Sequence, residues 1–126
     1  MKRVLKTRTF CRWQRKTGLQ DKMLRRAIEE MENGLIGADL GGDVFKKRIA
    51  LPGGGKSGGA RTLIATNKLD RWIFIYGFEK NERDNITQSE LVFLQWIAHD
   101  LLNCSDDALM SAIAQGELEE LRYERT

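Results

Sequence analysis

The chain has 126 residues, of which 41% are hydrophobic and 31% are charged. This length predicts one domain with a single core, and no apolar run approaches the roughly 18–20 residues of a membrane span. Two cysteines, Cys11 and Cys104, are too few for a disulfide framework and, with one histidine, offer no zinc motif. We therefore expect reduced thiols, a cytoplasmic location, no membrane partner and no cofactor.

The net charge of +3 hides a division along the chain. Residues 1–87 carry 19 Lys/Arg and 10 Asp/Glu, a balance of +9, whereas residues 88–126 carry 2 and 8, a balance of −6. The basic part favours a polyanionic partner. The acidic part is typical of solvated helix surfaces.

The first third of the chain predicts a short strand over residues 3–6 and a helix over 9–33 that breaks near Thr17-Gly18. Gly34 is expected to end the helix. After the break, apolar residues recur at spacings of three and four, which predicts one buried stripe: Leu19, Met23, Leu24, Ala27, Ile28 and Met31.

Three strands are predicted next, over residues 43–51, 61–67 and 71–78, with a glycine-rich loop after the first and a turn at 67–70. Both faces of the third strand are apolar, which predicts a central strand. Simple alternation places two groups of side chains on opposite faces: Trp72, Phe74, Tyr76 and Phe78 on one, Ile73 and Ile75 on the other.

The last third predicts two helices. Thr87 and Glu90 form a capping box, and the helix that follows has one apolar face made of Leu91, Leu94, Ile97, Ala98 and Leu101. Ser105 is expected to cap a final helix over 106–115, which Gly116 ends. The order predicts an α+β domain over residues 1–126, with N- and C-terminal helices packed on a small antiparallel sheet and an acidic helical extension from about residue 105.

The segment LPGGGKSGGARTLI, residues 51–64, is similar to loops that cradle phosphate. A nucleotide-binding P-loop needs a glycine where Ala50 stands and a helix after the loop, but Gly58 and Gly59 disfavour a helix there and the next residues, from Arg61, predict a strand. Without a helix N-terminus, nucleotide binding is disfavoured. A plain hairpin loop is the alternative, although Lys56 and Arg61 beside the glycines favour some other anion.

Side chains that usually perform acid–base catalysis are scarce. His99 is the single histidine and falls within a helix, which favours a structural or solvated role. What remains is a set of cations around the predicted sheet: Lys46, Lys47, Arg48, Lys56, Arg61, Lys80 and Arg83.

Two motifs together resemble the RelE/HigB-like toxins of type II toxin–antitoxin pairs. GKSGGARTLI and WIFIYGFEKNERDNIT are similar to the branch with a G-K-S-G-G-[aromatic]-R-[ST] loop and an F-x-K-N-E-R-x-N-I segment, and the match is strong over residues 44–92. Ala60 departs from this pattern by replacing the aromatic residue. If that ring packs against a nucleobase, we expect weaker substrate binding here.

The resemblance implies a RelE-like, microbial-ribonuclease-type fold and a ribosome-dependent mRNA endoribonuclease that inhibits translation. RNA supplies its own nucleophile, the 2′-hydroxyl, so cations can position it and stabilise the charge that develops. An ammonium group surrounded by arginine charge loses its proton more readily. Lys56 or Lys80 is therefore expected to act as base or acid, while Arg61 and Arg83 hold the scissile phosphate. The remaining RNA contacts are assigned to Lys46, Lys47, Arg48, Ser57 and Tyr76.

The resemblance also implies partners: the ribosome, mRNA, and a cognate antitoxin, expected to be a helix-turn-helix DNA-binding protein with an acidic or amphipathic segment. Two alternatives stay open. A ParE-type gyrase inhibitor has the same fold but acts by binding protein. A non-catalytic RNA- or DNA-binding module would use the same cations only for attraction.

Overall fold

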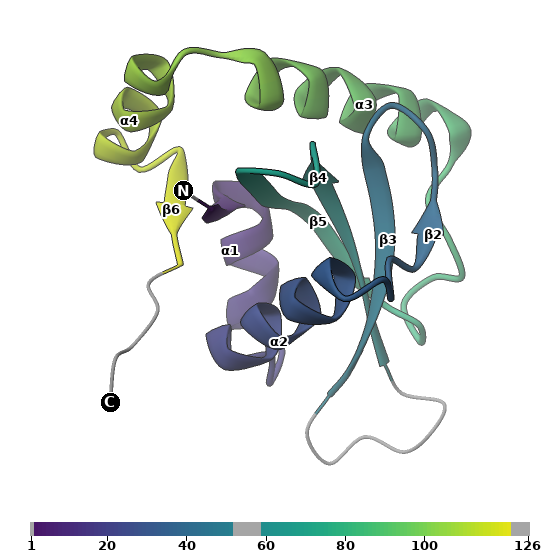
Figure 1. The fold of residues 1–126 in the computed structure, drawn as a ribbon. Coiled ribbons are helices and arrows are strands. Elements are labelled where there is room, and N and C mark those ends of the chain that lie inside the picture. Colours follow the sequence, from purple (N-terminus) through teal and green to yellow (C-terminus); the bar gives the residue numbers. More distant parts are fainter. Residues whose placement is uncertain (1, 52–58, 122–126) are drawn as a thin grey trace.

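A computed structural model of the chain describes residues 2–51 and 59–121 (Figure 1). Every element predicted from the sequence is present, and two short strands that were not predicted, β2 and β6, are added. None of the described helices is long and apolar enough to cross a membrane. The elements in chain order are β1 (Arg3–Thr7), α1 (Arg8–Arg15), α2 (Asp21–Glu32), β2 (Ala38–Asp39), β3 (Val44–Ala50), β4 (Gly59–Thr66), β5 (Arg71–Glu79), α3 (Gln88–Asn103), α4 (Asp106–Ala114) and β6 (Leu118–Glu120).

The strands form one six-stranded sheet in the order β2-β3-β4-β5-β1-β6. Strands β1 and β5 pair in parallel and the other neighbours are antiparallel. The α+β prediction is confirmed, and β5 is a central strand as expected. Within the described part of the C-terminal extension, α4 is helical as predicted, and residues 118–120 then pair with β1 and add β6 to the sheet.

The two faces of the sheet carry separate apolar clusters. Helices α1 and α2 contribute to one cluster, which includes Phe10, Ile28, Phe45 and Phe74. Helices α3 and α4 contribute to the other, in which Leu63, Leu94 and Leu109 are buried. Figure 1 shows α3 running across one end of strands β3–β5, so that the other ends of β3 and β4 extend beyond it.

The helix boundaries follow the predicted signals. Thr87 accepts a hydrogen bond from the backbone N–H of Glu90, whose carboxylate accepts one from the Thr87 N–H. Ser105 caps α4 by accepting a hydrogen bond from the backbone N–H of Ala108. Gly34 and Gly116 follow α2 and α4 with φ of 100° and 76°, which glycine adopts without steric conflict.

A β-bulge changes the faces of β5 and corrects one prediction. Leu63 pairs with Tyr76, but Ile64 pairs with Phe74, so Ile75 is an extra residue on β5. One extra residue inverts the alternation beyond it. Trp72 and Phe74 therefore pack in the cluster under α1 and α2, whereas Tyr76 packs against the cluster under α3. The prediction that all four aromatic side chains share one face is wrong.

Two buried cations tie the helices to the sheet. Arg71 donates to the carbonyl of Leu101 at 2.8 Å and to the carboxylate of Asp106 at 3.0 Å, which fixes the junction of α3 and α4. Lys6 contacts the carboxylates of Asp21 at 3.0 Å and Glu119 at 2.9 Å. Burial disfavours the Lys6 ammonium, but its hydrogen bonds to the two carboxylates outweigh that effect and raise its pKa.

Gly77 is required by close packing, because a Cβ atom at this position would clash with the indole ring of Trp13 on α1. We expect Gly77→Ala to lower the free energy of unfolding by roughly 1–3 kcal/mol, as overpacked cores do. The measurement is urea denaturation of Gly77→Ala in the wild-type and Trp13→Leu backgrounds. The loss should shrink in the second background, which removes the larger ring. Equal losses in both backgrounds would contradict this packing.

Candidate active site

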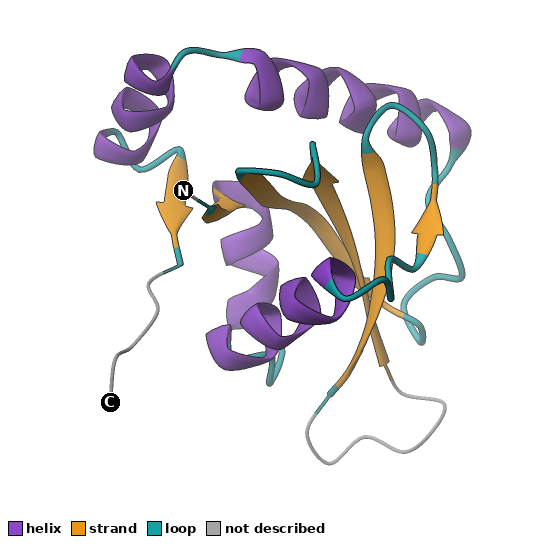
Figure 2. Cartoon of the chain, viewed as in Figure 1, coloured by secondary structure: helices purple, strands orange, loops and turns teal. Residues whose placement is uncertain are grey.

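Two arginines face each other where β3 and β4 extend beyond α3 (Figure 2). Arg48 on β3 pairs with Arg61 on β4, and Phe78 on β5 is the next residue in the same row. Side chains directly opposite in an antiparallel pair lie close together, and like charges there repel. The row therefore brings two positive charges together next to the buried ring of Phe78, which is 2% exposed.

A nitrogen of Arg61 lacks a partner at this position. Its Nη1 atom is buried and has no hydrogen-bond acceptor within the described part of the chain. A Cβ atom at Gly59 would lie 3.2 Å from Arg61 Nη1 and 3.6 Å from Arg48 Nε, so both guanidinium groups lie against this glycine. Leaving a buried donor unsatisfied costs about 1–3 kcal/mol. A phosphate oxygen is the acceptor that a guanidinium group fits best.

Arg83 is held by the first turn of α3. Its Nη1 and Nη2 donate to the two carboxylate oxygens of Glu90, at 2.9 and 2.5 Å. Its Nε donates to the carbonyl of Asn85, and Nη1 lies 3.4 Å from the hydroxyl of Tyr76. The guanidinium also lies 5.9 Å from the ring centroid of Phe78. Arg83 thus links Tyr76, Phe78 and α3, with its charge balanced by Glu90.

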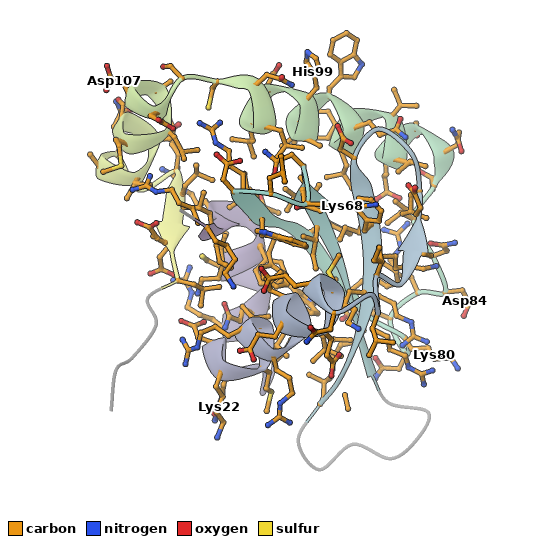
Figure 3. All side chains as sticks on the ribbon, viewed as in Figure 1. Lys22, Lys68, Lys80, Asp84, His99 and Asp107 are labelled. Atoms are coloured by element: carbon orange, nitrogen blue, oxygen red, sulfur yellow. The ribbon has the colours of Figure 1, made fainter. Side chains whose placement is uncertain are left out.

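Two predicted lysines lie near this row. The backbone N–H of Lys80 donates to the carbonyl of Gly59 at 3.2 Å, which places Lys80 just beyond the paired ends of β4 and β5. Its side chain is exposed and, in Figure 3, lies far from His99 on the outer side of α3. Lys46 precedes Arg48 by two residues on β3 and so occupies the same face.

The structure does not bring every predicted residue to this row. Lys47 points to the opposite face, is only 8% exposed, and bonds to the carbonyl of Leu35 and the carboxylate of Glu30. Ala60 is fully buried and alternates with Arg61, so its side chain lies on that opposite face as well. The effect of the missing aromatic ring on substrate binding stays a prediction. Lys56 and Ser57 lie outside the described residues, and their roles stay predictions.

Sequence reasoning missed three contributors: Gly59, Phe78 and Glu90. Glu90 was identified only as a helix cap, but one of its oxygens accepts from both the Thr87 N–H and Arg83. An arginine seven residues before a capping glutamate is not a recognised signal. Phe78 was placed by simple alternation alone, and its place beside Arg61 depends on the bulge at Ile75.

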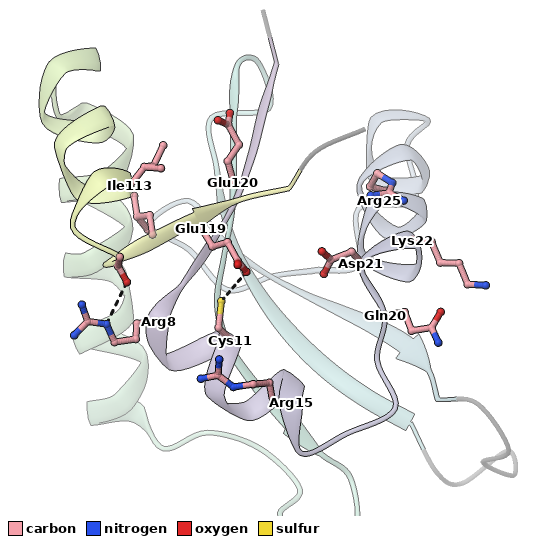
Figure 4. Close-up of a pocket in the computed structure, with 12 residues that line it drawn as sticks. Arg8, Cys11, Arg15, Gln20, Asp21, Lys22, Arg25, Ile113, Glu119 and Glu120 are labelled. Atoms are coloured by element: carbon pink, nitrogen blue, oxygen red, sulfur yellow. Dashed lines mark hydrogen bonds between the residues drawn. The ribbon is translucent and has the colours of Figure 1, made fainter. Parts of the chain in front are cut away.

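A cleft of about 900 Å³ lies away from the arginine row, between α1, α2 and β6 (Figure 4). Its walls carry both charges, with Arg8 and Arg15 from α1 and Glu119 from β6. Cys11 lies within it, and its thiol donates to Glu119. Burial raises the pKa of this thiol, so it is a poor nucleophile. Among the described residues, no group of three or more His, Cys, Asp or Glu side chains could hold a metal ion.

A family model described as the RelE toxin of the RelE/RelB toxin–antitoxin system matches residues 2–121. The chain belongs to the RelE toxin family. The predicted resemblance is confirmed, and the α+β fold agrees with it. No curated protein matches the chain. As a member of this family, the toxin has a cognate antitoxin as its partner.

The bonds from Arg83 and from the Thr87 N–H lower the pKa of Glu90 to about 2, from 4.5. We expect Arg83→Gln to raise this pKa toward 4.5, because only the Thr87 bonds then remain. A carboxylate with a depressed pKa adds stability above its unfolded pKa and loses it as the pH falls. The stability difference between wild type and Arg83→Gln should therefore be complete above pH 4.5, be much smaller at pH 2.5, and vanish only below pH 2.

The measurement is NMR titration of the Glu90 carboxyl carbon, with urea unfolding at pH 7 and pH 2.5. Lys80→Gln is the matched control, since it removes a nearby cation that makes no bond to Glu90 and should leave the titration unchanged. A Glu90 pKa that stays near 2 in Arg83→Gln would show that this pair does not determine it.

Proposed function

We propose that this toxin is a metal-independent, ribosome-dependent mRNA endoribonuclease that inhibits translation in the cytoplasm. The observation that carries the proposal is the pair of Arg48 and Arg61 over Gly59, in which a buried guanidinium nitrogen lacks an acceptor. Glycine lets an RNA backbone approach the two guanidinium groups closely. The scissile phosphate supplies the acceptor.

The chemistry requires no nucleophile from the protein. The 2′-hydroxyl of RNA loses its proton and attacks the neighbouring phosphorus, and the bond to the 5′-oxygen breaks as that oxygen takes up a proton. Negative charge grows on the two non-bridging oxygens during this step. Arg61, fixed on a strand, stabilises that charge better than a residue on a loop. Arg48 adds a second guanidinium from the opposite strand.

The groups that move the proton are proposed from their positions. Lys80 lies next to Gly59, and Tyr76 accepts a hydrogen bond from Arg83, which leaves the proton of its hydroxyl available to a leaving oxygen. We assign Arg83 to positioning Tyr76 and Phe78, because Glu90 engages both of its terminal nitrogens. Lys56 is proposed as the other acid or base, with Ser57 as an RNA contact.

Dependence on the ribosome follows from how little the site does alone. The row of arginines lies on an open face of the sheet, and the single histidine lies on the outer side of α3. Such a site stabilises charge but does not force the 2′-hydroxyl into line with the leaving oxygen. We propose that the ribosomal A site bends the mRNA into that geometry.

The arginine pair favours this function over the two alternatives. A gyrase inhibitor acts through protein contacts and does not require an unsatisfied guanidinium over a glycine. A passive nucleic-acid module needs cations spread along a surface, not a linked group of Arg83, Tyr76 and Phe78 at one row. The antitoxin is proposed to be a helix-turn-helix DNA-binding protein.

We expect Arg61→Ala to lower mRNA cleavage by about 100-fold or more, because one lost charge-stabilising contact has that effect. Lys56→Ala should abolish growth arrest too, whereas Arg83→Ala and Lys80→Ala should impair it strongly. Lys46→Ala is the matched control, a cation on the same face outside the row, and should change little. The measurement is primer extension on translated mRNA after induction, with circular dichroism to verify folding.

Ribosome binding separates the two roles of a cation. A transition-state contact lowers the cleavage rate and leaves binding nearly unchanged, while a simple phosphate contact weakens binding and its salt dependence. A folded Arg61→Ala protein that cuts at the wild-type rate would contradict the proposed site.

A further inference from the structure

The outer face of α3 carries three large apolar side chains in the solvent. Val92, Phe93 and Trp96 are 43%, 64% and 67% exposed. Residues three and four apart on a helix are neighbours, so Trp96 adjoins both of the others. We call these three residues the α3 outer face. Gln95, Trp96 and His99 line an open hollow beside it.

This arrangement differs from ordinary surface hydrophobics. Isolated exposed apolar residues need no explanation, but contiguous ones mark interaction surfaces. Helix α3 already buries Leu94 and Ala98 against the sheet, so it is apolar on both sides. A helix of that kind is covered on both sides. Phenylalanine and tryptophan are also the side chains that most often dominate binding energy at interfaces.

The charge around this face indicates what covers it. Residues 84–121 contain no Lys or Arg and eight Asp or Glu. Four of these acids pair with cations from other segments: Glu90, Asp106, Glu119 and Glu120. Asp100, one turn beyond Trp96, is exposed, as is Asp107 at the start of α4 (Figure 3). A complementary partner presents apolar side chains flanked by cations. A second copy of this chain would instead bring two acidic segments together, which disfavours a dimer through α3.

We propose that the α3 outer face binds an amphipathic, lysine- or arginine-flanked segment of the cognate antitoxin. The inference rests on membership of the toxin family and not on the proposed cleavage reaction. Such a segment inserts apolar residues around Trp96 and Phe93, while its cations meet Asp100 and Asp107. It lies on the side of α3 away from the sheet and so leaves the basic row of Arg48 and Arg61 uncovered.

The α3 outer face and the candidate active site are connected through the first turns of α3. Phe93 is three residues, about one turn, from Glu90, which holds Arg83. A segment that contacts Phe93 therefore lies about one turn from the group that positions Tyr76. The hollow beside Trp96 has one fixed wall, because Gln95 donates to the carbonyl of Leu40 on the β2–β3 side.

The test uses the full chain and, as probe, the protein encoded by the adjacent gene. Phe93→Ser/Trp96→Ser should raise the dissociation constant, measured by isothermal titration calorimetry, by roughly 30-fold or more. Buried aromatic side chains are the residues that typically dominate binding energy at an interface. The matched control is Leu35→Ser/Leu69→Ser, which alters two side chains that are 61% and 77% exposed and lie in loops outside α3. It should stay within about threefold of wild type.

Three outcomes would overturn this inference: unchanged affinity in Phe93→Ser/Trp96→Ser, no binding of the adjacent-gene protein to the wild-type chain, or a wild-type dimer that this double substitution makes monomeric. Loss of growth arrest with intact antitoxin affinity would assign the face to the ribosome and overturn it too. The expected double variant still arrests growth and escapes the antitoxin. If the wild type proves unable to cleave mRNA, the affinity comparison still decides this inference, so the two proposals fail separately.

Discussion

The candidate site depends on the guanidinium of Arg61, one nitrogen of which is buried without a hydrogen-bond acceptor in the described residues. The other buried cations of the described residues are paired. Lys6, Lys47 and Arg71 are buried, and each contacts a carboxylate from a helix or from β6. Arg61 Nη1 is also buried, but no acceptor within residues 2–51 and 59–121 reaches it, and Arg48 is the residue opposite. Packing alone does not favour this arrangement. Under the proposed function, the bound RNA phosphate would supply the missing acceptor.

The rest of the fold brings suitable groups to that row. The bulge at Ile75 turns Tyr76 and Phe78 toward the arginines, and Gly77, now on the other face, leaves room for Trp13. The end of α3 nearest the site supplies Glu90, which holds Arg83 against Tyr76. One irregular residue in the central strand thus places Gly77 against Trp13 on one face, and Tyr76 and the buried Phe78 beside the arginine row on the other.

Local sequence signals predicted the helices and most of the strands. Features that depend on how the strands pair with one another could not be predicted. The capping residues Thr87 and Ser105 and the stripe of α2 depend on neighbouring residues only, so the sequence shows them. The bulge depends on how β4 pairs with β5, which no local pattern reveals. The same limit explains Lys47, since three consecutive cations must alternate between faces and only β3 pairing shows which one meets Glu30. Strand β6 is three residues long and forms because β1 offers an edge.

The most direct measurement is the free energy of unfolding of wild type and Arg61→Met, determined by urea denaturation at low and moderate salt. Methionine keeps the aliphatic stem and removes the unsatisfied charge. If the guanidinium is retained for binding and not for folding, Arg61→Met is more stable by about 1 kcal/mol at both salt concentrations, because the buried donor without an acceptor is removed. A less stable Arg61→Met protein would contradict this account, since Arg61 would then support the fold itself.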